Sequence, residues 1–211
     1  MWALSAVLTV EALEGLDSPL LGVTIGLVFS ALAYALKQAG VKRIFTLSGN
    51  HIMSVFDALL DSGIHLLHTR HEAAAVHMAD AYARLTGEPG VALVTGGPGH
   101  ANAVSALYTA QMSESPVLLL SGHAPNDQLG LGAFQEMRQS EMAATVTKAA
   151  WTSRDARGIA GDIARALRIA LGGRPGPVNV NLPSDALHDK TQVGGLVNSG
   201  NDQSPSATLP G

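Results

Sequence analysis

Glu72 stands where an apolar run gives way to a helical pattern, a position where a carboxyl group can exchange protons with a ligand. An acidic residue at a helix N-terminus is also stabilised by the helix dipole, so a purely structural role stays open. A second segment, Gly97 to Asn102, nearly matches the dinucleotide fingerprint GxGxxG, but Asn102 replaces its last glycine. A nucleotide-binding oxidoreductase is therefore an alternative that this weak match alone does not favour.

The sequence lacks the residues that several other kinds of site would need. His71-Glu72 opens an apparent HExxH zinc motif, but Ala75 occupies the second histidine position. The chain has 8 histidines without metal-ligand spacing and no GxSxG elbow, and the lack of cysteine excludes disulfides and thiolate metal sites. The net charge of -4 gives no basic footprint for nucleic acid.

The hydrophobic periodicity predicts alternating strands and helices. Hydrophobic residues make up 46% of the 211 residues and charged residues 14%, which is typical of a buried core. We predict strands at 41–47, 64–69, 91–95, 116–120, 146–151 and 177–182. We predict helices at 27–38, 51–62, 72–86, 100–112 and 155–171, and a long loop at 123–139. This alternation predicts an α/β fold, a doubly wound parallel sheet flanked by helices.

Four predicted strands end in polar or glycine-rich segments. These segments are 48–51, 69–72, 95–99 and 121–123. Because ligands of doubly wound sheets bind outside the carboxyl ends of the strands, we expect a pocket there. Loops between strands and helices are often polar and rich in glycine for structural reasons alone, which is the competing explanation.

We expect an N-terminal extension at 1–22, a domain at 23–190 and a linker or flexible tail at 191–211. Ser18 to Leu36 contains no charged residue and approaches the length of a membrane span, but glycines and Pro19 favour a core helix. Residues 1–17 contain no Lys or Arg and make a poor signal peptide. We therefore expect a cytoplasmic protein, with membrane association through residues 18–36 as the alternative.

Several ordered motifs carry a resemblance that spans about Val23 to His188. They are FTLSGNH (45–51), TRHEAAA (69–75), ADAYARLTG (79–87), GVALVTGGPG (90–99), SPVLLLSG (115–122) and FQEM (134–137). The chain resembles the N-terminal, pyrimidine-binding domain of thiamine-diphosphate (ThDP) enzymes. The resemblance is to the branch of acetolactate synthase, benzaldehyde lyase and 2-hydroxyacyl-CoA lyase.

The resemblance implies roles for individual residues. Glu72 matches the glutamate that hydrogen-bonds the aminopyrimidine ring and activates ThDP, which makes it catalytic and cofactor-binding. The other cofactor-binding residues implied are Gly49, Asn50, Thr95, Pro98 and Gly99. His51 and Gln135 match active-site residues that contact the substrate or its intermediates. A polar residue near a helix N-cap and a solvated loop side chain are the structural alternatives for these two.

The resemblance also implies a 2-keto or 2-hydroxyacyl substrate and a carboligase, lyase or decarboxylase reaction. The domain that supplies the Mg²⁺ ligands in the family has no counterpart in these 211 residues, and neither does the usual start of the first helix. We therefore expect half of a site, completed by a ThDP diphosphate-binding domain in another chain, and a homo-oligomer. FAD use is undecidable from the sequence. A fragment or split subunit, inactive alone, is the expected state; a non-catalytic domain pairing with a full-length homologue is the alternative.

Overall fold

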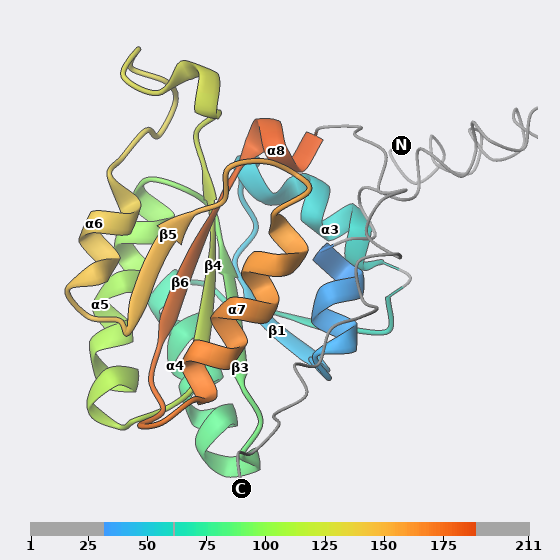
Figure 1. The fold of residues 1–211 in the computed structure, drawn as a ribbon, viewed down its shortest axis with the longest axis vertical. Coiled ribbons are helices and arrows are strands. Elements are labelled where there is room, and N and C mark those ends of the chain that lie inside the picture. Colours follow the sequence, from blue (N-terminus) through green and yellow to red (C-terminus); the bar gives the residue numbers. More distant parts are fainter. Residues whose placement is uncertain (1–31, 61, 189–211) are drawn as a thin grey trace, which may run out of the picture.

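Six parallel strands form a single sheet in the order β2-β1-β3-β4-β6-β5 (Figure 1). The computed structural model describes residues 32–60 and 62–188. The strands are β1 (Arg43–Thr46), β2 (His65–His68), β3 (Gly90–Val94), β4 (Val117–His123), β5 (Ala149–Thr152) and β6 (Val178–Pro183). Every neighbouring pair is parallel, which confirms the predicted doubly wound α/β class.

Helices cover both faces of the sheet (Figure 1). Residues 32–38 are helical, and the named helices are η1 (Asn50–Ile52), α3 (Met53–Leu59), α4 (Glu72–Thr86), α5 (Pro98–Met112), η2 (Asn126–Gln128), α6 (Gln139–Ala144), α7 (Ile159–Leu171) and α8 (Ser184–His188). One buried cluster joins the sheet to helix 32–38, α3, α7 and α8. The other joins the opposite face to α4, α5 and α6. The inner strands β3, β4 and β6 are buried at every residue, as a parallel sheet covered on both faces requires, whereas the edge strands β2 and β5 are half-buried or exposed.

Small residues allow α4 to pack closely on β3. Ala75, Ala79 and Ala83 are buried on the inner face of α4. A Cβ atom on Gly90, the first residue of β3, would lie 2.0 Å from the Ala79 carbonyl oxygen. Only glycine fits at this contact, so the close approach that places the start of α4 beside the sheet is encoded in these small side chains.

Several predicted boundaries were wrong. The helix predicted from His51 begins as the 3-10 turn η1, and its α-helical part ends at Leu59. The helix predicted from Asp155 begins at Ile159, because the Asp155 carboxylate accepts a hydrogen bond from the Gly158 N–H at 2.9 Å and holds a turn there. Conversely, α5 begins at Pro98, two residues earlier than predicted, since proline is well suited to the first helical position.

The segment 18–36 that raised the possibility of membrane association falls mostly outside the described residues. Its last part is helical, and Leu32, Ala33 and Leu36 are buried in the core. Among residues 32–60 and 62–188, no helix has both the length and the apolar character needed to cross a bilayer. The extension predicted at 1–22 and the tail at 191–211 also lie outside the described residues.

Candidate cofactor site

Glu72 is the first residue of α4 and lies at the carboxyl end of the sheet. The preceding His71 caps the helix, because its Nδ1 accepts a hydrogen bond from the Ala73 N–H at 3.1 Å. The half-buried Glu72 carboxylate points towards the start of α5, where Asn102 Nδ2 donates to its Oε2 at 3.0 Å. Its other oxygen, Oε1, lies 3.2 Å from the place where a Cβ atom on Gly99 would be.

Two glycines bring bare backbone against Thr95, the residue that follows β3. A Cβ atom on Gly99 would lie 2.7 Å from Thr95 Cγ2, and a Cβ atom on Gly49 would lie 2.4 Å from Thr95 Cβ. Neither position accepts a side chain without displacing Thr95. The Glu72 carboxylate therefore borders a wall in which two backbone segments meet at a threonine.

His51 joins the same wall from η1. The side chain is buried, and its Nδ1 lies 3.3 Å from Thr95 Oγ1. The imidazole stacks on the Phe134 ring with 5.9 Å between ring centroids. Burial lowers the pKa of His51, and the backbone of Phe134 and the nearby side chain of Gln135 offset only part of this effect. The neutral imidazole therefore predominates near pH 7.

Gln135 approaches the site over the glycine turn that precedes α5. A Cβ atom on Gly97 would lie 2.7 Å from Gln135 Cβ, and Gln135 itself has a φ of 58°, in the left-handed region. Its side-chain Oε1 is buried and has no hydrogen-bond partner among the described residues. A buried carbonyl oxygen without a donor is costly, so it is a group available to a ligand.

The contacts thus bring together most of the residues predicted from the sequence, which are Gly49, His51, Glu72, Thr95, Gly99 and Gln135. Asn50 is exposed, and no hydrogen bond within the described part of the chain involves its side chain. Pro98 is exposed as the first residue of α5. Asn102 was missed, because the sequence presented it only as a departure from GxGxxG. Its position one turn into α5, directly after the glycine turn, was the available indication.

A buried polar network next to the site holds the turn at Gly97 in place. Gln139 accepts a hydrogen bond from the Gly97 N–H at 2.8 Å and donates to the Gly122 carbonyl at 3.0 Å and to Asn181 Oδ1 at 2.9 Å. The Gln139 carbonyl lies 3.1 Å from His100 Nε2, and Ser121 Oγ lies 2.8 Å from His100 Nδ1. Because a carbonyl only accepts, Nε2 donates and Nδ1 accepts, which a neutral ring satisfies. Burial lowers the pKa of His100 to about 4.

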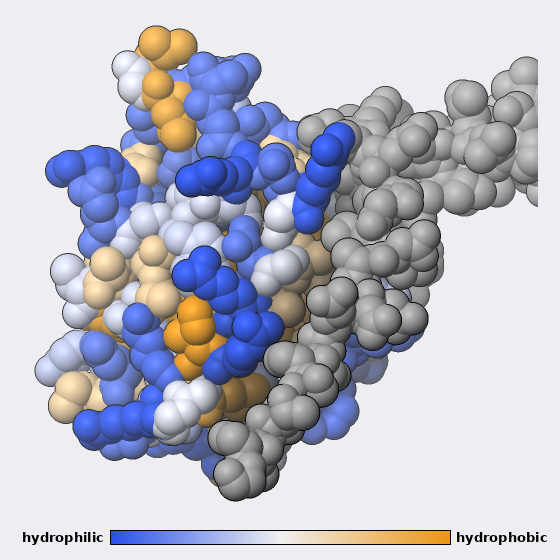
Figure 2. All heavy atoms as spheres, viewed as in Figure 1, coloured by the Kyte–Doolittle hydropathy of each residue, from blue (hydrophilic) through white to orange (hydrophobic). Residues whose placement is uncertain are grey.

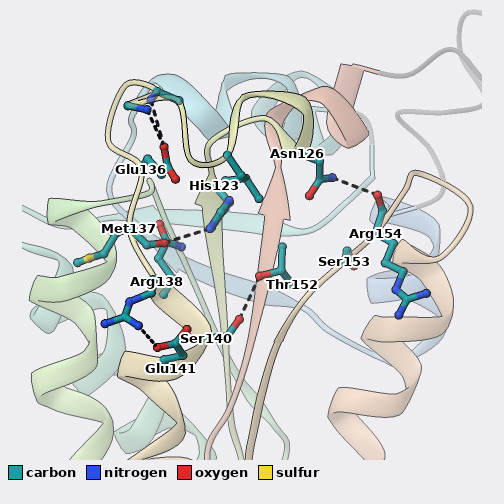
Figure 3. Close-up of a pocket in the computed structure, with 14 residues that line it drawn as sticks. His123, Asn126, Glu136, Met137, Arg138, Ser140, Glu141, Thr152, Ser153 and Arg154 are labelled. Atoms are coloured by element: carbon teal, nitrogen blue, oxygen red, sulfur yellow. Dashed lines mark hydrogen bonds and ion pairs between the residues drawn. The ribbon is translucent and has the colours of Figure 1, made fainter.

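The pocket of about 610 Å³ shown in Figure 3 lies on the other side of the loop 124–138. His123, Arg138, Thr152 and Arg154 are among its lining residues, whereas Glu72, His51 and Gln135 are not. Leu129 and Leu131 of this loop are exposed, and Figure 2 shows an orange patch at the projecting tip at its upper left. Within the described ranges, no group of three or more His, Asp or Glu side chains is placed to hold a metal ion.

An acid beside closely packed glycines at the carboxyl end of a parallel sheet is an arrangement found in domains that bind one end of a cofactor. Residues 28–142 match the family model "Thiamine pyrophosphate enzyme, N-terminal TPP binding domain", and the chain belongs to this family.

The similar sequences belong to longer proteins. The chain is 44% identical over 158 residues to 2-hydroxyacyl-CoA lyase 2 of Danio rerio, covering 75% of this chain and 25% of that protein. It is 41% identical over 160 residues to the acetolactate synthase isozyme 3 large subunit of Escherichia coli strain K12, covering 75% and 28%. Human 2-hydroxyacyl-CoA lyase 2 is 43% identical over 157 residues, covering 74% and 25%. The chain therefore spans about a quarter of these relatives.

Proposed function

We propose that this domain binds the aminopyrimidine end of ThDP in a gap beside Glu72 Oε1, against the wall formed by Gly49, Thr95 and Gly99. The whole enzyme would make or break a carbon–carbon bond beside the carbonyl of a 2-keto or 2-hydroxyacyl substrate. The observation that carries the proposal is the position of Glu72 Oε1, 3.2 Å from where a Gly99 side chain would begin. A flat ring suits this wall, because the two glycines that pack on Thr95 carry no side chains to keep it away from the backbone. The names of the relatives, acetolactate synthase and 2-hydroxyacyl-CoA lyase, support the class of reaction.

Each residue of the wall has a task in this proposal. Glu72 holds or releases a proton at Oε1, opposite a ring nitrogen of the cofactor. Thr95 and the two glycines set how closely the backbone approaches the ring. When bound, ThDP supplies a nucleophilic carbon and an electron sink, chemistry that protein side chains lack. The protein contributes position and electrostatics.

His51 and Gln135 are proposed to face the substrate. The neutral His51 ring can donate from one nitrogen and accept at the other, which suits a substrate hydroxyl or carbonyl group. The unpaired Gln135 Oε1 can accept a hydrogen bond from a hydroxyl group of the substrate. Both residues approach the gap from loops, Gln135 over Gly97 and His51 beside Thr95.

A partner domain would complete the site over α4 and α5. Glu72 and Asn102 begin this surface, and large apolar side chains are exposed further along both helices. They are Met78 and Leu85 on α4, and Tyr108 and Met112 on α5. We propose that a diphosphate-binding domain of another chain covers this surface and contributes the Mg²⁺ ligands. Self-association of the whole enzyme follows, because each subunit would then supply half of two sites.

Calorimetric titration of ThDP and Mg²⁺ tests the proposal on this chain alone and mixed with a separately expressed diphosphate-binding domain of a relative. Binding is expected only in the mixture. In Glu72→Gln the turnover of the mixture should fall by about 100-fold or more, the scale of a lost proton-transfer group. Folded protein that forms the mixed complex but binds no ThDP would overturn the catalytic proposal and leave a domain that pairs with a homologue without catalysing.

A further inference from the structure

The two oxygens of the Glu72 carboxylate have different surroundings. Oε2 accepts the hydrogen bond from Asn102 Nδ2 at 3.0 Å. Oε1 lies 3.2 Å from the place where a Cβ atom on Gly99 would be, and no hydrogen bond among the described residues involves it. Asn102 lies on the exposed side of α5, so the amide reaches Glu72 from the neighbouring helix and not from the sheet.

This asymmetry decides where a proton can reside. The Asn102 NH₂ group only donates, so Oε2 must accept and cannot present a proton in the same direction. A proton on the Glu72 carboxyl group is therefore directed to Oε1, the oxygen at the gap. The hydrogen bond also fixes the orientation of the carboxylate, since a glutamate held at one oxygen loses most of the rotation about its last torsion angle.

We infer that Asn102 is a positioning residue that fixes Glu72 through Oε2 and thereby assigns proton exchange with the bound ring to Oε1. This inference rests on the proposed function, because it gives Oε1, the oxygen that Asn102 leaves free, a partner in ThDP. Removing the amide should leave the gap, and hence the affinity, almost unchanged. It should slow the step that depends on where the proton of Glu72 lies.

The contact is tested first on the chain by itself. In ¹⁵N-edited NMR spectra, the Asn102 side-chain amide signal is identified by its loss in Asn102→Leu. It should move in Glu72→Gln, which changes the group that accepts its hydrogen bond, and stay in place in the control Glu136→Gln, which lies on a different loop. An amide signal that does not respond to Glu72→Gln overturns the inference, whatever the cofactor does.

The consequence is tested in the ThDP-loaded mixture, by calorimetry for the dissociation constant and by NMR for hydrogen–deuterium exchange at C2 of bound ThDP. Asn102→Leu keeps the side-chain size and removes the donor, so C2 exchange should slow by about 10- to 100-fold while the dissociation constant stays within about threefold. Asn102→Gln, which restores an amide, should recover part of the rate. Gln128→Leu replaces an exposed amide side chain of η2, away from α4 and α5, and should change neither quantity.

The outcomes separate the two proposals. Failure of the native mixture to bind ThDP overturns the proposed function and removes the basis of the inference. Normal binding with unchanged exchange in Asn102→Leu overturns the inference alone. Equal losses of affinity and exchange in Asn102→Leu also overturn it, because they assign Asn102 to binding or docking and not to the placement of a proton.

Discussion

The two halves of the sheet differ, at the carboxyl ends of the strands, in whether their polar side chains have hydrogen-bond partners within the protein. Beside β1 and β3, Glu72 Oε1 and Gln135 Oε1 accept no hydrogen bond from the described residues. Beside β4 and β6, Gln139 and His100 use both ends of their side chains in hydrogen bonds within the protein. Exceptions in the second half are Asn179 Oδ1 and Asp185 Oδ1, which are buried and have no partner within the described ranges.

The difference shows how the same end of a sheet can be held rigid and still offer unpaired polar groups to a ligand. Gln139 links the two halves, because its side chain holds the Gly97 N–H while its backbone continues into the loop that carries Gln135. Buried polar networks rigidify their surroundings only when they are satisfied. The half beside β4 and β6, whose polar groups are mostly paired (the closed half), therefore keeps the backbone of the half beside β1 and β3 (the open half) in place. The open half retains unpaired groups for a ligand.

The largest effect on stability is expected from a substitution that breaks the hydrogen-bond network of the closed half. Gln139→Leu leaves the buried Gly97 N–H and Asn181 Oδ1 without their partners, so we expect the free energy of unfolding to fall by about 4 kcal/mol. Chemical denaturation measures this loss. The matched control is Gln128→Leu, an exposed glutamine of η2, which should change stability by less than about 0.5 kcal/mol. Equal, small effects of the two substitutions would show that the network does not support the edge.

The pH dependence of stability tests His100, the second anchor of the closed half. Burial lowers the pKa of His100 from 6.5 to about 4, so between these values the unfolded chain binds a proton that the folded chain does not. This contribution is fully present above pH 6.5 and is lost as the pH falls towards 4, up to about 3 kcal/mol.

Denaturation curves at several pH values measure this effect as a slope. His100→Phe removes the titrating ring, so its stability should fall less steeply between pH 6.5 and 4 than that of the native chain. His77→Phe, at an exposed position of α4, should keep the native slope. A native slope in His100→Phe would assign the loss of stability to other groups.

The same contrast explains what the sequence predicted and what it missed. The sheet and its order of elements follow from strongly apolar runs such as 91–95 and 116–120, whose burial on both faces leaves little choice of structure. Glu72 and the glycine turn were found because they stand at strand ends. Asn102 was missed, since its partner comes from another helix and no local pattern specifies a contact between α4 and α5. The closed network was missed for the same reason, because Gln139, His100 and Asn181 come from separate elements.

The smallest effect is expected in the open half, and its sign is opposite. Gln135→Leu replaces a buried oxygen that has no donor within the described part of the chain by an apolar group of similar size. We expect the unliganded chain to gain up to about 1 kcal/mol of stability, since no hydrogen bond to this oxygen is lost. Both residues carry a Cβ atom, so the cost of the positive φ is nearly unchanged.

Turnover in the ThDP-loaded mixture should meanwhile fall by about 10-fold or more, because the proposed substrate contact is gone. Denaturation of the free chain and steady-state kinetics of the mixture provide the two measurements, with Gln128→Leu as the control for both. A loss of stability in Gln135→Leu comparable to that in Gln139→Leu would place Gln135 in the closed half and remove the contrast. Gain of stability with loss of turnover is the combination expected of a residue whose unpaired oxygen is kept for a ligand.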